Sequence, residues 1–153
     1  KFGGHPMAAG LSLPTENIDL FRAKLNRQQT LTEKELTPVT WIDVPMPVSY
    51  ASKKLVEQLR VLEPFGKGNE KPVFADRKLT VRSANMIGKN KNVLKMQLED
   101  TQGHVVDAIQ FKVEEEDMPL CGKEISIVYY PDINEFRGNQ TLQFIVQEWC
   151  YTT

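Results

Sequence analysis

The residues best suited to chemistry in this 153-residue sequence stand near its start, where Gly3 and Gly4 precede His5. Paired glycines let a ligand or another backbone come close, because no Cβ stands in the way. An imidazole at that point can donate a hydrogen bond to a phosphate or a carboxylate. The motif alone is also explained by an ordinary surface turn, so both interpretations stay open here.

Few other residues are of the kinds that enzymes use in catalysis. The two histidines are His5 and His104, and no clustered Asp/His motif is present that could hold a metal ion. His104 falls beside a predicted hairpin turn, which favours a solvated strand residue. No nucleophilic triad is visible either. We therefore expect no catalytic residues, no metal site and no cofactor in this chain, and binding is the better hypothesis.

Composition and charge set further bounds. Hydrophobic residues make up 41% and charged residues 25%, which is ordinary for globular proteins. The net charge of −1 gives no overall positive field that would indicate a nucleic-acid partner. No apolar run reaches membrane-spanning length, and no signal peptide is present, so we expect a cytoplasmic protein without a membrane partner. Cys121 and Cys150 are expected to be reduced thiols. The chain begins at Lys1 without an initiator methionine, which suggests a piece of a larger protein.

The elements that must position these residues begin with a helix. The spacing predicts an amphipathic helix over residues 16–28, with Thr15 as its N-cap. Its apolar face is expected to pack in a core and comprises Ile18, Phe21 and Leu25. Residues 30–38 are polar and predict a linker with at most one helical turn, because Thr32-Glu33-Lys34-Glu35 is a capping-box pattern. A short strand over residues 39–44 follows. Ser49 can then cap a second helix, with Leu55, Leu59 and Leu62 on one face.

Beyond Phe74 the pattern is almost entirely strands and turns. Five strands are predicted, and residues 131–139 are predicted to be a loop between the last two. The strand ranges are 73–86, 93–98, 105–111, 124–130 and 140–149. Five strands of which the first is long and bent are typical of a small Greek-key barrel of the OB type. The predicted fold class is α+β, mainly β, and an SH3-like barrel is the structural alternative.

An OB barrel binds nucleic acid through the face of its second and third strands and the loops between strands 1–2 and 4–5. These loops would hold two lysines and an aromatic residue beside a cation, a pair that suits a single strand because the base stacks while the cation meets phosphate. Further cations lie on strand 2 and near the first loop. The predicted DNA contacts are Arg82, Lys89, Lys91, Lys95, Phe136 and Arg137.

The charge of the barrel argues the other way. From Pro72 onward there are nine Lys/Arg and twelve Asp/Glu, which gives a net charge of −3. DNA binding would therefore depend on a local patch, with the acidic residues 114–117 turned away from it. An OB module that contacts protein instead of DNA is a serious rival.

Two motifs add a resemblance to a known family. They are Phe2-Gly3-Gly4-His5-Pro6-Met7-Ala8-Ala9-Gly10-Leu11 and Leu62-Glu63-Pro64-Phe65-Gly66-Lys67-Gly68-Asn69. Both resemble segments of bacterial RecJ, the family of single-strand-specific DNA exonucleases. The resemblance spans nearly the whole chain, and the two motifs in this order, followed by an OB-like barrel, are more specific than either alone.

The resemblance implies an organisation and a role. In that family a DHH domain binds manganese or magnesium, a DHHA1 domain ending in the Gly-Gly-His motif closes the other side of the cleft, and an OB domain follows. Residues 1–29 would be the end of DHHA1, 30–38 a linker, and 39–153 the OB domain with a leading strand and helix. Gly3, Gly4 and His5 would contact the substrate phosphate beside a metal site that lies outside this chain.

The function implied is the DNA-binding part of a 5′ to 3′ exonuclease of DNA repair and recombination, in which the barrel grips single-stranded DNA. The chain alone is then expected to be inactive. Two alternatives remain at this stage. One is a noncatalytic OB module that docks another repair protein. The other is a DHH-family phosphoesterase acting on short oligonucleotides, although such an enzyme would not need this barrel.

Overall fold

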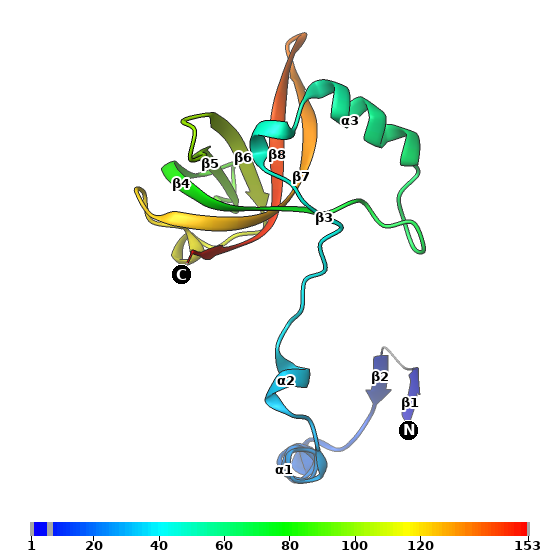
Figure 1. The fold of residues 1–153 in the computed structure, drawn as a ribbon. Coiled ribbons are helices and arrows are strands. Elements are labelled where there is room, and N and C mark those ends of the chain that lie inside the picture. Colours follow the sequence, from blue (N-terminus) through cyan, green and yellow to red (C-terminus); the bar gives the residue numbers. More distant parts are fainter. Residues whose placement is uncertain (1, 6–7, 153) are drawn as a thin grey trace. The chain divides into compact units, whose positions relative to one another are not determined.

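The structure is a computed structural model that describes residues 2–5 and 8–152. Pro6 and Met7 of the glycine-rich motif lie outside the described residues. The chain forms two compact units, Lys1–Thr40 and Trp41–Thr153 (Figure 1).

The first unit begins with a short antiparallel hairpin of β1 (Phe2–His5) and β2 (Ala8–Leu11). Gly3 pairs with Gly10 and Gly4 pairs with Ala9 across it. A 3-10 turn over Thr15–Asn17 leads into α1 (Ile18–Gln28). The predicted helix is present. The predicted N-cap is wrong, because Asn17 takes that position and its side chain makes no capping hydrogen bond.

The apolar face of α1 is not covered within its own unit, Lys1–Thr40. Ile18, Phe21 and Leu25 remain 42%, 36% and 52% exposed, and no residue of the helix is buried. The spacing that predicted this face is correct, but the expected core packing is not present within the unit Lys1–Thr40.

The predicted capping box forms at α2 (Glu33–Leu36). The backbone N–H of Glu35 donates to the Thr32 hydroxyl, and the backbone N–H of Thr32 donates to the Glu35 carboxylate at 2.8 Å. Helix α2 consists of one turn, as the pattern predicted, because the box satisfies the first backbone donors and no buried face extends the helix.

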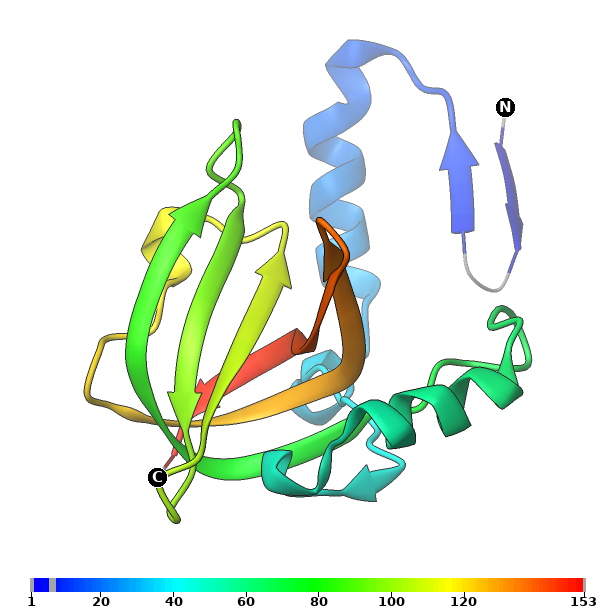
Figure 2. The ribbon, with the colours of Figure 1, turned by 90° about the horizontal axis from the view of Figure 1, so that it is seen from above.

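The second unit is a closed barrel. Its long strands are β4 (Phe74–Ile87), β5 (Val93–Glu99), β6 (Val105–Phe111), β7 (Glu124–Phe136) and β8 (Asn139–Tyr151). The sheet order is β4-β5-β6-β8-β7, and β7 returns to pair with β4 (Figure 2). Strands β6 and β8 are parallel, whereas the other pairs of long strands are antiparallel. This closed order confirms the predicted barrel of the OB type.

Alternation along the strands builds the barrel core. Leu94, Met96 and Leu98 of β5 are fully buried, while the residues between them point outward. Tyr129 and Phe144 pack with ring centroids 5.2 Å apart inside the same core. The Tyr129 hydroxyl donates to the backbone carbonyl of Met46 at 2.9 Å, and burial raises the pKa of this phenol well above its ordinary value.

The last two strands are longer than the sequence predicted. Residues 131–139 are not a loop, because β7 and β8 form one long hairpin, here called the β7–β8 arm. Its turn is Arg137-Gly138, with φ of 53° and 78°, as a two-residue turn of type I′ requires. Pro131 does not end the strand, because β4 pairs with β7 only as far as Tyr129 and leaves that edge open. A proline without an N–H is tolerated at such an edge.

The segment before the barrel is less regular than predicted. Only Val44–Pro45 (β3) pairs as a strand, in parallel with the start of β4. The second helix is α3 (Lys53–Leu59), and its N-cap is Ser52 rather than the predicted Ser49. Val56 is its fully buried residue, whereas Leu62 stays half-exposed because it belongs to a following 3-10 turn.

The second motif of the family resemblance, residues 62–69, folds into a turn that is held by hydrogen bonds within the segment. The side-chain amide of Asn69 donates to the carbonyls of Leu62 and Pro64 at 2.8 and 2.9 Å. Phe65 then meets the ring of Tyr130 edge-on, with centroids 6.3 Å apart. The Lys71 ammonium lies 4.1 Å from the centroid of that same Tyr130 ring. These contacts fasten the helix-to-strand connection to the base of the arm.

Candidate nucleic-acid interface

The outer face of the β5–β6 pair is the candidate interface. Outward residues of β5 include Lys95 and Gln97, which stand opposite Ile109 and Asp107 of β6. Strand β4 continues this face with Asn85 beside Lys95. Ile109 is buried, so the exposed side chains of this face are a cation and amides, which can meet phosphates and base edges.

Three of the predicted lysines share one end of this surface. Lys89 and Lys91 lie in the β4–β5 turn, and Lys95 lies on β5 two pairs from that turn; all three side chains are exposed. Gly88 and Lys91 adopt positive φ of 86° and 46°, and the Lys91 N–H donates to the Gly88 carbonyl at 3.2 Å. The tight turn holds the two loop lysines close in space.

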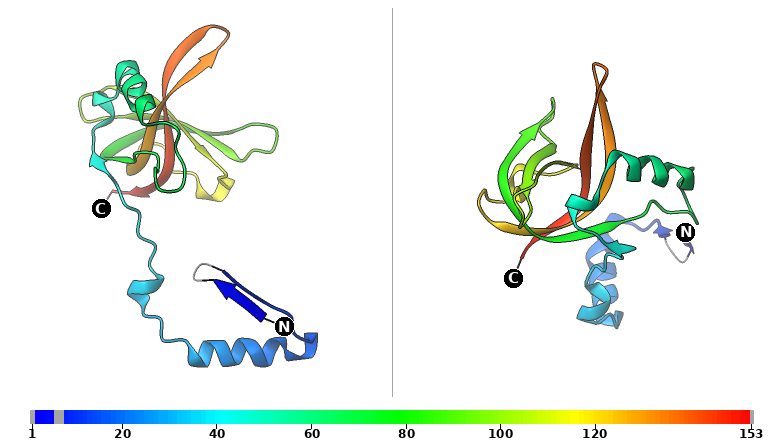
Figure 3. Two further views of the ribbon diagram at one scale, coloured as in Figure 1. Left: turned by 90° about the vertical axis from the view of Figure 1, so that its right-hand side faces the viewer. Right: turned by 45° about the horizontal axis from the view of Figure 1, so that its top comes forward.

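The other predicted pair lies at the tip of the β7–β8 arm. Phe136 is 65% exposed, and the Arg137 guanidinium carbon lies 5.1 Å from the centroid of its ring. The Lys53 ammonium of α3 donates to the Gln140 carbonyl at 2.6 Å, which ties the helix to the arm near its tip. Figure 3 shows the β4–β5 hairpin and the arm extending out of the barrel with their tips apart, so the structure does not bring the two groups together.

Sequence reasoning missed Phe111. It ends β6 opposite Val93, beside the β4–β5 turn, and its ring is 55% exposed on the same face as Lys95. An exposed aromatic ring near three lysines is a stacking platform for a base. The period-two pattern of β6 could have placed it on the outer face with Asp107, but its exposure depends on how the barrel closes, since Ile109 on the same face is buried.

Arg82 lies away from the turn lysines. It is the extra residue of a bulge in the middle of β4, and its guanidinium forms an ion pair with Glu99. The hydrogen bond and the charge of Glu99 raise the pKa of this guanidinium further above its ordinary value. With Asp107 on the same face, this half of the surface carries carboxylates, so the positive patch is confined to the end near the β4–β5 turn.

The Gly-Gly-His motif forms strand β1 of the small hairpin in the first unit. Gly3, Gly4 and His5 are all exposed. A Cβ placed on Gly3 or Gly10 would meet no atom within 4 Å, so the backbone of this pair is open to another molecule. Among residues 2–5 and 8–152, no group of three or more His, Cys, Asp or Glu could hold a metal ion.

The family model of the RecJ OB domain matches residues 42–148, which is the region of the barrel and its leading helix. The chain belongs to the RecJ OB domain family. Single-stranded-DNA-specific exonucleases RecJ from Haemophilus influenzae, Escherichia coli and Bacillus subtilis are 38%, 33% and 32% identical over 95%, 95% and 96% of the chain. The chain covers 26%, 26% and 19% of those proteins, so it spans about a quarter of their length or less.

A solved structure confirms the fold. The crystal structure of RecJ from Thermus thermophilus in complex with Mn2+ superposes with a TM-score of 0.69 at 19% identity, over 100% of this chain and 22% of that one. A second crystal structure of that protein, in complex with Mg2+, gives 0.65. No helix of the described residues is long and apolar enough to cross a membrane.

Proposed function

We propose that this chain is the substrate-gripping part of a RecJ-type exonuclease and that its barrel holds single-stranded DNA. The observation that carries the proposal is the positive end of the β5–β6 face, where Phe111 is exposed beside Lys89, Lys91 and Lys95. Base stacking and phosphate neutralisation are the two contacts that hold single strands with little regard to sequence. Membership of the RecJ OB domain family supports the same role.

In this proposal Phe111 and Phe136 contact different parts of the DNA strand. Phe111 is fixed by the barrel and stacks a base over the β5–β6 face. Phe136 stands at the tip of the arm, already stacked by Arg137, and meets the strand where it enters or leaves. A single strand is long and flexible enough to contact both tips, whereas a duplex keeps its bases unavailable for stacking.

The test is fluorescence anisotropy of labelled single- and double-stranded oligonucleotides with the 153-residue chain. We expect a preference for single strands, and each of Phe111→Ala and Phe136→Ala should cost about 1–3 kcal/mol of binding. Tyr50→Ala serves as the matched control, because this exposed ring lies on the leading segment outside the interface. Circular dichroism verifies folding. Equal binding of single and double strands, with both variants like wild type, would refute the gripping role.

The proposal extends to the activity of the longer protein, here called the parent protein, of which this chain would be a part. We propose a cytoplasmic enzyme of DNA repair and recombination that degrades single strands 5′ to 3′ with manganese or magnesium. The described residues offer no such donor set, so the ions would be held by residues outside this chain. Gly3, Gly4 and His5 would contact the phosphate backbone of the strand, because the open Gly3 backbone admits it and the imidazole can donate to it.

The chain alone is therefore expected not to hydrolyse DNA, with or without manganese, because metal-assisted cleavage needs ligands to hold the ions. The measurement is nucleotide release from a single strand by a nuclease-free preparation. Metal-dependent release would show that the catalytic groups lie within these 153 residues.

A further inference from the structure

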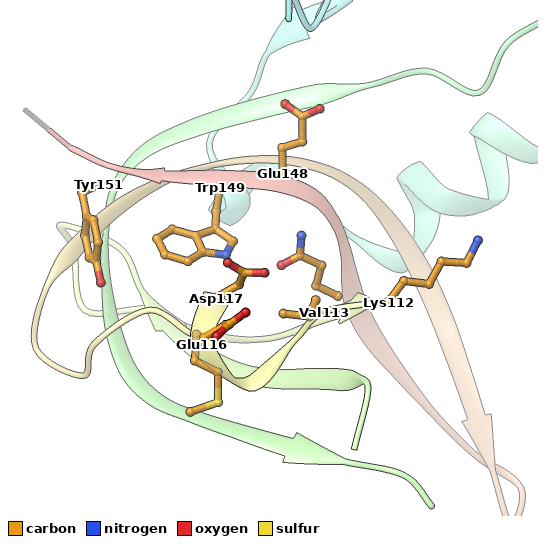
Figure 4. Close-up of a pocket in the computed structure, with 9 residues that line it drawn as sticks. Lys112, Val113, Glu116, Asp117, Glu148, Trp149 and Tyr151 are labelled. Atoms are coloured by element: carbon orange, nitrogen blue, oxygen red, sulfur yellow. The ribbon is translucent and has the colours of Figure 1, made fainter. Parts of the chain in front are cut away.

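A pocket of about 500 Å³ lies between the end of β8 and the connection from β6 to β7, within the barrel unit. Figure 4 shows Trp149 and Tyr151 of β8 on one side and the carboxylates of Glu116 and Asp117 on the other. Its volume falls in the range of sites that bind small molecules or single side chains. Nothing in the proposed DNA grip uses this pocket.

The walls of the pocket are held in place. The rings of Trp149 and Tyr151 meet edge-on with centroids 5.2 Å apart, and the backbone N–H of Leu120 donates to the Tyr151 hydroxyl at 3.1 Å. The acidic wall is a 3-10 turn in which the Asp117 N–H donates to the Glu114 carbonyl at 3.0 Å. A site whose walls are fixed before binding loses little entropy when it is filled.

The charge inside the pocket is negative. Glu116 and Asp117 face it, whereas Figure 4 shows the side chain of Glu148 on the other side of the β8 ribbon from Trp149 and that of Lys112 extending away from the acidic pair. Two carboxylates repel a DNA phosphate and attract a cation. A bound metal ion is a poor alternative, because the described residues contain no group of three or more potential ligands.

The side-chain oxygen of Gln110, which also lines the pocket, has no hydrogen-bond donor. The side chain of Gln110 lines the pocket; its amide nitrogen donates to the Gln147 carbonyl at 3.1 Å, but its buried oxygen Oε1 has no hydrogen-bond partner. Buried acceptors are nearly always satisfied, so this oxygen is left to accept from a water or from a molecule bound in the pocket. The hydrogen bond to the Gln147 carbonyl fixes the side-chain amide in the orientation that leaves its oxygen unpaired.

We propose that this pocket binds an arginine side chain of a partner protein. A guanidinium is planar and stacks on indole, and it presents five N–H donors in one plane. It can therefore lie on Trp149 while it donates to the acidic pair and to Gln110 Oε1. A lysine ammonium stacks less well and reaches fewer acceptors from one position, so the pocket discriminates arginine from lysine.

The probe is the acetylated, amidated tripeptide Gly-Arg-Gly, and the signal is the fluorescence of Trp149. The chain has two tryptophans, so the measurement uses a Trp41→Phe background; Trp41 is 85% exposed and lies outside the pocket. We expect a saturable change with Gly-Arg-Gly, a weaker one with Gly-Lys-Gly, and none with the citrulline peptide, which keeps the shape of arginine but has no charge.

Two nearly isosteric variants test the acidic wall. Glu116→Gln and Asp117→Asn should each weaken binding about tenfold, because each removes a charged acceptor of the guanidinium. Glu114→Gln is the matched control on the same connection, and it should bind as the background does because Glu114 does not line the pocket. Near-ultraviolet circular dichroism verifies that every variant keeps the fold.

Several results would overturn the proposal: no saturable change with the arginine peptide, an equal response to the citrulline peptide, or an equal loss in Glu114→Gln. A thymidine oligonucleotide is the last ligand to be tested. If it shifts the Trp149 signal and competes with the peptide, the pocket belongs to the nucleic-acid path instead. The outcomes with the three peptides do not depend on whether the β5–β6 face binds DNA, so the two proposals fail or stand separately.

Discussion

The two units of this chain differ in where their apolar side chains lie. The barrel unit, Trp41–Thr153, buries a continuous core of strand residues around Tyr129 and Phe144. In the unit Lys1–Thr40 no residue among 2–5 and 8–40 is buried, although it contains a hairpin, a helix of three turns and a complete capping box. Local hydrogen bonds and helical spacing thus specify the shape of an element, but stability comes from the surface that it buries.

The same contrast separates the functional roles that we propose. The core of the barrel holds the strands and the turn that carry Phe111 and the lysines, so under this proposal the barrel would bind DNA by itself. The glycine hairpin offers an open backbone and a histidine, but its unit has no core of its own in this chain. Under this proposal its contribution depends on a longer protein, and variants in the two units should affect different measurements.

The largest effect should come from the core itself. Phe144→Ala removes a fully buried ring that packs on Tyr129, and it should lower the free energy of unfolding by about 3–5 kcal/mol. Phe21→Ala on α1 is the matched control and should change it by less than about 0.5 kcal/mol. Urea unfolding followed by circular dichroism measures both. Comparable losses from the two variants would show that α1 packs on the barrel and would abolish the contrast.

The next effect concerns His5 in the intact parent protein. His5→Ala should slow cleavage about a hundredfold, because a donor near the scissile phosphate acts on positioning and charge. Binding of long single strands should hardly change, since the barrel contacts remain. His104→Ala is the control and should leave cleavage unchanged. Single-turnover cleavage and anisotropy measure the two quantities, and equal losses in both would assign His5 a structural role.

The sequence predicted the parts of this fold that depend on local pattern. The alternation of β5 and the capping box of α2 are read directly from neighbouring residues, and both are present. The extent of the β7–β8 arm could not be read in this way. By local rules Pro131 marks the end of a strand. It is tolerated inside β7 because the pairing of β4 with β7 ends at Tyr129, two residues before the proline. That is a property of the closed sheet.

The candidate sites show the same limit. The sequence placed Lys89 and Lys91 in an exposed turn, as the structure does, because a turn and its charges are local. Phe111 was missed because the exposure of the last residue of a strand depends on what the neighbouring strands cover. The partner of Arg82 was missed because a bulge in β4 places it beside Glu99. The arginine pocket joins Gln110, Asp117 and Trp149 from three segments, which only the folded barrel brings together.

A smaller effect should come from the turn lysines. Lys89→Ala and Lys91→Ala should each weaken DNA binding modestly and make its salt dependence shallower. The log–log slope should change by about 0.7 for each phosphate that the variant no longer neutralises. Lys24→Ala on α1 is exposed too, and it should leave both affinity and slope unchanged. Anisotropy at several salt concentrations measures the slopes. Parallel slopes for all four proteins would exclude the β4–β5 turn from the interface.

The smallest effect compares two carboxylates, one in each unit, that accept backbone hydrogen bonds. Burial raises the pKa of Asp100, but hydrogen bonds from the backbone and ring of His104 and from the Gln102 N–H outweigh it and lower the pKa below its ordinary value. Hydrogen bonds from the Thr32 backbone and hydroxyl likewise lower the pKa of Glu35.

A carboxyl whose pKa is lower in the folded state stabilises that state above its unfolded pKa, and this stabilisation is lost as the pH falls through the folded pKa. Asp100→Asn should therefore destabilise the barrel at about pH 5 to 6, and the difference from wild type should shrink as the pH falls towards about 3. Glu35→Gln should leave barrel unfolding unchanged over that range, because the capping box of α2 belongs to the unit without a core. Thermal unfolding across this pH range decides the matter. A pH-dependent change of barrel stability in Glu35→Gln would mean that the first unit is coupled to the barrel after all.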